Sequence, residues 1–342
     1  GFNKGKSTTD NLLFVDYQVC NALSHSNHIS LISLDFEKAF EKIGLHTILE
    51  QLISWKIGPK IINYIIHFMT NRKFTVKINA KKSEIKNLYN GIPQGSPLSV
   101  VLFLIAFNKL SEIVSIQKEI EFCAYADDFI LIINSKRKNP TIDLNALFTN
   151  ILEWCNTSGA KLSVNKCKHL HICRKHNCTC NIIINNVHLQ NVENLKILGI
   201  TFNQRYLWNS HVENLLKSLK KSLNVLKCLS SVKYNCNTQT LINTNNALLV
   251  SKISYGLTIF GYCPKSTMNK IRTIHNTAAR CCLGAYRTTR IDNLLFETNI
   301  QPIEYLRDKL CSKQIKNIYN SHDSPLKIPV KKLSKHNKNI RL

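Results

Sequence analysis

Two adjacent aspartates, Asp127 and Asp128, stand between two short apolar segments, residues 122–126 and 129–133. Both segments are rich in aromatic and β-branched residues, which is typical of two antiparallel strands joined by a tight turn. A strand pair that is apolar on both faces is normally buried. Two carboxylates at its turn repel each other unless a positive charge lies close by. A divalent cation is the simplest such charge, although aspartate is also a common turn residue that needs no ligand.

A third carboxylate, Asp35, follows residues 29–34, which read as a buried strand. The end of a strand is a position at which functional side chains recur. An amphipathic helix is expected after it, with apolar positions at Leu45, Ile48, Leu49, Leu52 and Ile53. A third carboxylate makes a metal site a better interpretation of the Asp127-Asp128 pair than a simple turn.

The chain is strongly basic, with 46 Lys and Arg against 21 Asp and Glu, a net charge of +25. This excess indicates a polyanionic partner, nucleic acid before an anionic membrane surface. Hydrophobic residues at 44% exclude a disordered tail. Thirteen cysteines without regular spacing, and no signal-peptide pattern, predict a reduced, intracellular protein. The longest apolar run, near residues 100–107, is expected to be too short to span a membrane.

Further elements follow from the pattern of apolar residues and helix breakers. A helix is expected from Pro59, a lysine-tipped hairpin from residues 73–78 and 83–88, and an apolar helix over residues 98–114. The loop at residues 91–97 contains two glycines and two prolines. It either presents its backbone and the Gln94 amide to a substrate or simply connects two elements. Residues 159–166 are expected to form a loop and strand, followed by paired strands at 169–172, 182–184 and 195–202. Later helices are expected at 212–229, 238–250 and 268–282, before a basic tail at 331–341.

A group of histidines and cysteines offers a competing metal site. Soft ligands at this density could bind zinc. No Cys-x-x-Cys pair is present, so a cysteine-rich hairpin without metal is favoured and zinc stays open. The group comprises Cys167, His169, His171, Cys173, His176, Cys178 and Cys180.

The order of these segments resembles the palm of reverse transcriptases, and more closely that of LINE-type, jockey-like retrotransposons without long terminal repeats. The resemblance is carried by residues 1–10, 33–40, 91–97, 125–128, 159–166, 195–211, 254–256 and 284–289. It implies an α+β right-hand polymerase fold with partial fingers, an antiparallel palm sheet and a helical thumb. Fingers and palm are expected at residues 1–208, the thumb at 209–290, and a helical extension with the basic tail at 291–342. Since the chain starts at Gly1, we expect a fragment that lacks the first fingers segment and any endonuclease.

The sequence departs from the family pattern at Glu41, Ala160 and Cys167, where the family usually has Asp, Leu and Thr. None of these departures removes an expected metal ligand.

The resemblance implies an RNA-directed DNA polymerase that uses an RNA template, a DNA primer or target, and dNTPs. Hard cations prefer oxygen ligands, so two Mg²⁺ ions, or Mn²⁺ as a substitute, are expected. Asp35 and Asp127 are the expected direct ligands and Asp128 completes the acidic cluster. The family adds the backbone carbonyl of Phe36 as a ligand.

Phe40 lies five residues after Asp35, where the family carries an aromatic ring that leaves no room for a 2′-hydroxyl. The same ring could equally be a core residue on the apolar face of a helix. By resemblance, Pro93, Gln94 and Gly95 contact the nucleotide and template, and Lys166 protonates the leaving pyrophosphate.

Two other interpretations compete with a reverse transcriptase. The first is a non-catalytic RNA-binding palm, either maturase-like or a domesticated relic. The second is the palm of a viral RNA polymerase, which Phe40 argues against because those enzymes place a polar acid at that position. For a retrotransposon protein we expect a ribonucleoprotein in nucleus and cytoplasm, with no membrane partner. The sequence does not indicate the oligomeric state.

Overall fold

A computed structural model of the chain describes residues 5–117, 119–137, 144–174, 178, 180–184, 187–231, 233–321 and 323–330. The chain falls into two compact units, Gly1–Asn11 with Gln18–Glu193 and Leu12–Tyr17 with Asn194–Leu342. The predicted boundaries at residues 208 and 290 stay predictions. The first four residues of the expected fingers segment, His176 and the basic tail lie outside the described residues.

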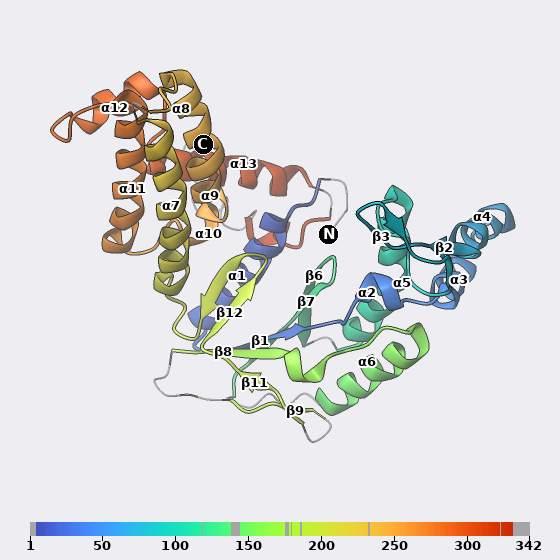
Figure 1. Ribbon diagram of the computed structural model, residues 1–342. Coiled ribbons are helices and arrows are strands. Elements are labelled where there is room, and N and C mark those ends of the chain that lie inside the picture. Colours follow the sequence, from blue (N-terminus) through green and yellow to red (C-terminus); the bar gives the residue numbers. More distant parts are fainter. Residues whose placement is uncertain are drawn as a thin grey trace. The chain divides into compact units, whose positions relative to one another are not determined.

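The first unit is built on a sheet with the strand order β11-β8-β1-β7-β6 (Figure 1). The central strand β1 runs antiparallel to β7 on one side and to β8 on the other. The short strand β11 joins the edge in a parallel sense, so the predicted antiparallel sheet is confirmed for the other four strands. The strand bounds are β1 His28–Leu34, β6 Ile120–Tyr125, β7 Asp128–Ser135, β8 Lys168–Ile172 and β11 Gln190–Asn191.

The predicted strand before Asp35 and the predicted Asp-Asp hairpin are both confirmed. Six of the seven residues of β1 are buried, as expected for a central strand, and these include the polar residues His28 and Ser30. Strands β6 and β7 meet at a two-residue turn, with Tyr125 paired to Asp128. Ala126 occupies the turn at φ +54, in the left-handed region that tight hairpins require.

Helix α1 Thr8–Ser24 contributes residues to both units, and the other helices of the first unit are α2 Ala39–Lys42, α3 Leu45–Ser54, α4 Pro59–Met69, α5 Pro97–Ser115 and α6 Leu144–Ser158. The predicted helices from Pro59 and over residues 98–114 are confirmed. The helix expected after Asp35 is two helices, because Ile43 and Gly44 leave the helical conformation and the Gly44 N–H donates to the Ser158 carbonyl instead. Ile53, expected on the apolar face, is 62% exposed.

Helix α5 is long and apolar enough to cross a membrane, with a mean hydropathy of 1.7, so the expectation that no apolar segment reaches this length is wrong. A helix in the core of a globular protein passes the same test. One side of α5 packs in the hydrophobic core of the first unit together with Leu131 and Ile133 of β7. The buried residues of α5 are Ser99, Leu102, Phe103, Ala106, Phe107, Leu110 and Val114.

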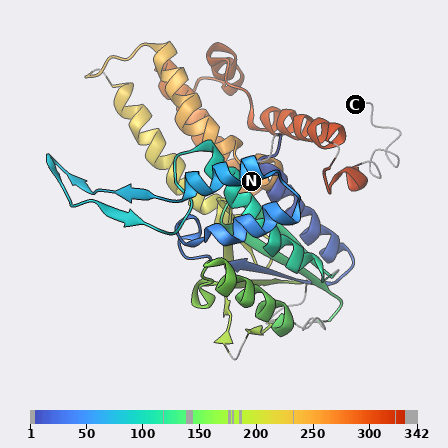
Figure 2. The same cartoon turned by 90° about the vertical axis from the view of Figure 1, so that its right-hand side faces the viewer.

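The predicted lysine-tipped hairpin is a long two-stranded arm, drawn in cyan in Figure 2. Its base pairs β2 Arg72–Phe74 with β5 Lys86–Leu88, and its tip pairs β3 Lys77–Ile78 with β4 Lys81–Lys82.

Residues 159–202 differ from the expected arrangement. The segment 159–166 forms no strand: it makes one bridge, Phe36 with Leu162, and then a 3-10 turn, η1 Val164–Lys166. Strand β8 pairs with β1 and β11, whereas β9 Ile183–Ile184 pairs with β10 Val187–His188. The expected pairing of 169–172 with 182–184 in a cysteine-rich hairpin is therefore wrong within the described residues.

The second unit combines one hairpin with helices (Figure 1). The hairpin pairs β12 Asn194–Ile197 with β13 Ile200–Asn203, which confirms strand structure at 195–202. The helices predicted at 212–229 and 268–282 are confirmed as α7 and α11, and the one predicted at 238–250 passes from α8 into a π-helical turn, η2 Asn246–Val250. The helix bounds are α7 Asn209–Leu229, α8 Thr238–Asn245, α9 Ser251–Ser254, α10 Leu257–Phe260, α11 Lys265–Leu283, α12 Ile291–Thr298 and α13 Ile303–Asn320.

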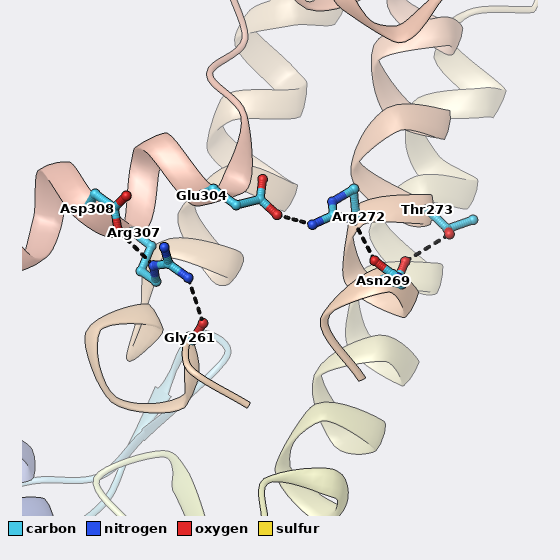
Figure 3. A network of polar contacts seen from close by, with 7 residues as sticks. All are labelled: Gly261, Asn269, Arg272, Thr273, Glu304, Arg307 and Asp308. Carbon is cyan, nitrogen blue, oxygen red and sulfur yellow. Dashed lines mark hydrogen bonds and ion pairs between the residues drawn. The ribbon is translucent and has the colours of Figure 1, made fainter. Parts of the chain in front are cut away.

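Polar contacts join α13 to its neighbours within the second unit (Figure 3). Arg272 of α11 forms an ion pair with Glu304, at the start of α13. Arg307, one turn further, donates to the Gly261 carbonyl at 3.3 Å and to the Asp308 carboxylate at 2.8 Å. Helix α13 thus contacts both α11 and the turn after α10.

Candidate active site

The register of β1 against β7 brings the three predicted aspartates to one end of the sheet. The last pair of this ladder is Leu34 with Phe129. Asp35 directly follows Leu34, and Asp128 directly precedes Phe129. In an antiparallel pair the next position along the ladder sets these two aspartates opposite each other. Asp127 lies in the adjoining turn, and all three residues are exposed.

The electrostatics of Asp128 reflect this gathering of charge. The Asp128 side chain is exposed, but neighbouring atoms remove part of the water around its carboxylate. This partial burial is the largest of the three effects that raise the pKa of Asp128. The like charges of Asp127 and then Asp35 raise the pKa further. The site is therefore one in which negative charge is costly without a nearby cation.

The three aspartates form an open group. Two groups of residues in the described part of the chain have at least three metal-binding donor atoms within 4.8 Å of one another. Both groups consist of histidines and cysteines. The aspartates are spread more widely than that. Mutual repulsion of three carboxylates opposes a closer approach.

Backbone hydrogen bonds hold the strand end that carries Asp35 and Phe36. The Ser163 N–H donates to the Asp35 carbonyl, and the Glu37 N–H donates to the Lys161 carbonyl, each at 2.9 Å. Neither bond uses the Phe36 carbonyl, the group expected to bind metal. The Phe36 ring is buried and packs edge-on against other aromatic rings of the core, which anchors this backbone.

Lys166 lies on a turn that is connected to Asp35 through the backbone. Its N–H donates to the Ser163 carbonyl at 2.9 Å, and Ser163 in turn donates to Asp35. The Lys166 side chain is exposed, and no ion pair joins it to an aspartate within the residues described. The structure places Lys166 on the segment that borders the site without bringing its amine into contact with the carboxylates.

Phe40 combines features of both interpretations given for it. Its ring stacks on Phe103 of α5, with ring centroids 4.0 Å apart and an interplanar angle of 11°. The side chain is only half-buried. One face of the ring is thus a core contact, and part of it remains accessible to a ligand.

The loop at residues 91–97 is fastened at its start and exposed at its centre. The Gly91 N–H donates to the Ile43 carbonyl at 3.2 Å, and the Arg72 guanidinium donates to the Gly91 carbonyl at 2.6 Å. Gln94 and Gly95 are exposed, whereas the Pro93 carbonyl accepts a hydrogen bond from the Ser99 hydroxyl.

Arg72 is a positioning residue of this loop that sequence reasoning missed. It also donates to the Asn90 carbonyl, at 3.0 Å. A lone arginine next to a predicted strand carries no sequence signal for such a role.

The histidine and cysteine group is only partly as predicted. His171, Cys173 and Cys178 come together, and His28 at the start of β1 joins them. Sequence reasoning missed His28, because 143 residues separate it from His171. Cys167 lies apart from this group, buried in the core with its thiol on the Ser163 carbonyl at 3.4 Å.

A carboxylate cluster at the end of a mainly antiparallel sheet, in an α+β chain with this excess of positive charge, fits the polymerase class predicted from the sequence. The chain belongs to the reverse transcriptase (RNA-dependent DNA polymerase) family, whose family model matches residues 1–202. This membership confirms the predicted family and, with it, the polymerase fold of the first unit.

The chain is similar to polymerases of mobile elements. It is 22% identical over 297 residues to the RNA-directed DNA polymerase from mobile element jockey of Drosophila melanogaster, covering 85% of this chain and 32% of that protein. It is 21% identical over 286 residues to the probable RNA-directed DNA polymerase from transposon X-element of the same species, covering 83% and 31%. The predicted jockey-like resemblance is confirmed, and the chain spans about a third of the length of these curated relatives.

Solved structures of telomerase are also similar. Telomerase from Candida albicans in complex with a TWJ fragment of telomeric RNA matches at 10% identity and a TM-score of 0.43, covering 98% of this chain and 53% of that one.

Proposed function

We propose that this chain is the polymerase portion of a non-LTR retrotransposon reverse transcriptase and adds deoxynucleotides to a primer 3′ hydroxyl on an RNA template. Family membership and the similarity to mobile-element polymerases support this proposal. The single observation that carries it is the meeting of Asp35 with Asp127 and Asp128 at one end of the sheet.

The donor set at this site fits magnesium. The like charges of Asp127 and Asp35 raise the pKa of Asp128, so a divalent cation would relieve a repulsion that the fold itself creates. Carboxylate and carbonyl oxygens are the ligands that Mg²⁺ prefers, with Mn²⁺ as a substitute. When bound, two Mg²⁺ ions would supply Lewis-acid activation of the attacking hydroxyl and stabilisation of the leaving pyrophosphate.

The three aspartates and the Phe36 carbonyl would have different roles at the metal site. Asp35 and Asp127 would hold the metal ions together with the Phe36 carbonyl, which the two flanking backbone bonds leave unused. Asp128, whose pKa is raised by partial burial and by its like-charged neighbours, would supply supporting negative charge. The hydrogen bonds of Ser163 and Glu37 keep the Asp35 segment in place, so that the geometry is preorganised.

Substrate selection would rest on Phe40 and the loop at 91–97. The Phe40 ring is held by its stack on Phe103, so it could exclude a 2′-hydroxyl without moving. Exposed Gln94 and Gly95, with Pro93, would contact the nucleotide and template. Lys166 would protonate the leaving pyrophosphate, a role that requires its exposed side chain to swing toward the site.

The net charge of +25 suits an RNA template and a DNA primer or target. Binding through phosphates would be largely independent of sequence and sensitive to salt. A ribonucleoprotein in nucleus and cytoplasm would be the corresponding cellular form.

Primer extension with dNTPs on an RNA template in Mg²⁺ tests the proposal. Asp127→Asn should lower the extension rate by about two orders of magnitude or more, because the neutral amide removes charge from the metal site. Asp292→Asn, at an exposed aspartate of α12, should extend primers like the wild type.

Equal extension by Asp127→Asn and the wild type would refute the assignment of the metal site. RNA binding by a wild type that never extends a primer, unchanged by Asp127→Asn, would indicate the non-catalytic RNA-binding palm instead.

A further inference from the structure

The pairing of β1 with β8 aligns histidine and cysteine side chains on one face of the sheet. Ser30 pairs with His171 and Ile32 pairs with His169. Side chains alternate between the faces of a strand, so Cys173, two residues after His171, continues on the same face. One pair beyond the end of the ladder, His28 stands opposite Cys173. His28 of β1, His171 of β8 and Cys173, just after β8, thus share one corner of the sheet.

Cys178 completes this corner. Its Sγ lies 3.6 Å from His171 Nε2 and 3.8 Å from His28 Nδ1, and those two nitrogens are 3.2 Å apart. The donor atoms of all four residues, Cys173 included, lie within 4.8 Å of one another. His28 and His171 are buried, and the two cysteines are half-buried.

These distances match the edges of a tetrahedral zinc site. Zinc binds nitrogen at about 2.0 to 2.1 Å and sulfur at about 2.3 Å, with tetrahedral angles. That geometry requires nitrogens about 3.3 Å apart and nitrogen and sulfur about 3.6 Å apart. The three separations in the structure fall within about 0.2 Å of these values.

We propose that His28, His171, Cys173 and Cys178 bind one structural Zn²⁺. Two imidazoles and two thiolates form a Cys₂His₂ set, which closes all four positions of a tetrahedral ion and leaves none for a substrate. Thiolate and imidazole donors also select zinc over magnesium.

Ser30 orients the His171 ring for this role. The Ser30 hydroxyl lies 3.4 Å from His171 Nδ1 and 3.0 Å from His169 Nε2. A proton on His171 Nδ1, donated to the Ser30 oxygen, leaves the Nε2 lone pair directed at the metal. Histidine ligands of zinc commonly use their second nitrogen in this way, which fixes tautomer and ring orientation.

A second grouping of His169, His171 and Cys180 is a weaker candidate. It offers three ligands instead of four, and all three are buried. Cys180 belongs to the hydrophobic core of the first unit. The half-buried cysteines of the four-residue group leave a path by which an ion can enter.

The proposed zinc lies far from the aspartates. His28 begins β1 and Asp35 follows its end, so the two are seven residues apart along an extended strand, about 23 Å. The zinc would join the start of β1 to the segment after β8 and stabilise the sheet. It would not take part in nucleotidyl transfer.

Zinc content of the purified chain, expressed with zinc and dialysed, tests the proposal. The wild type should retain about one zinc per chain. Cys178→Ser and His28→Ala should each lose most of it. Cys236→Ser, a half-buried cysteine of the second unit, and Cys180→Ser, from the competing group, should retain it. Far-ultraviolet circular dichroism identifies any variant that fails to fold.

Cobalt provides a measurement on the wild type alone. Replacement of zinc by Co²⁺ should produce the intense visible bands of a tetrahedral ion together with thiolate charge-transfer bands, and added Zn²⁺ should abolish them. A wild type that retains no zinc and gives no tetrahedral cobalt spectrum would overturn the proposal. Loss of zinc in Cys180→Ser with retention in Cys178→Ser would overturn the ligand assignment.

Discussion

Gly91 is the point at which a single methyl group should most clearly damage the candidate active site. Its φ is +83, in the region that glycine adopts freely and other residues adopt at a cost. A Cβ built there would lie 2.5 Å from the carbonyl oxygen of Glu41 and 2.8 Å from its Cα. Both are backbone atoms at the end of α2, so no side chain can rotate away to relieve the clash.

The expected cost of Gly91→Ala is the sum of two contributions. Strain at positive φ costs about 1 to 2 kcal/mol. Displacement of packed backbone adds about 1 to 3 kcal/mol. The total is about 2 to 5 kcal/mol, a large fraction of the stability of a typical domain.

Gly95→Ala is the matched control, because Gly95 lies in the same loop at φ +97 with nothing within 4 Å of a built Cβ. It should show the strain cost alone. Gly91→Ala should therefore melt about 2 to 12 °C below Gly95→Ala, since 1 kcal/mol corresponds to about 2 to 4 °C for a unit of this size. Differential scanning calorimetry of both variants measures the difference. Equal melting temperatures would refute the packing argument for the start of this loop.

Two further predictions concern the buried His211 and the ring of Phe40. Burial lowers the pKa of His211 to about 4, with Lys196 adding to the effect. In the unfolded chain the pKa of His211 is near 6.5, so below that pH the unfolded chain binds a proton that the folded chain does not bind until about pH 4. The free energy of unfolding should therefore fall by about 2 kcal/mol between pH 7.5 and pH 5 because of His211. His211→Asn, which can still accept the Thr201 N–H, should lose that part of the pH dependence in urea unfolding. Phe40→Ala should cost about 2 kcal/mol through the lost stack on Phe103 and should increase ribonucleotide incorporation, whereas Phe40→Tyr should retain both properties.

Each of these predictions has a clear contradicting result. An unchanged pH dependence in His211→Asn would show that this imidazole titrates normally in the folded chain. Unaltered selection against ribonucleotides in Phe40→Ala would leave Phe40 as a core residue only.

Local patterns in the sequence were sufficient for the elements that carry the active site. The apolar strand before Asp35, the hairpin around Asp127 and Asp128, and the long helix after Pro97 are all confirmed. Each depends on the periodicity of neighbouring residues and on turn or cap residues, which act within a few positions along the chain. The charge excess and the order of the motifs were also sufficient to predict the family, which the family model confirms.

Tertiary structure decided which elements lie together. Two-residue periodicity shows which side chains share a face of a strand, but not which strand pairs with which. The sequence predicted β8 beside residues 182–184, whereas β8 pairs with β1. That pairing is what brings His28 to His171, a contact that no local pattern contains.

The same holds at the other end of β1. Asp35 and Asp128 are 93 positions apart, and their alignment depends on the register that buries the apolar faces of β1 and β7 together. The sequence by itself determined that this chain carries carboxylates at strand ends and soft ligands in a cluster. Only the pairing of β1 with both neighbours decided that the carboxylates meet at one end of that strand and the histidines and cysteines at the other. The reason is that strands pair when segments far apart in the sequence bury apolar surface against each other. The pattern of residues within one segment does not identify its partner segment.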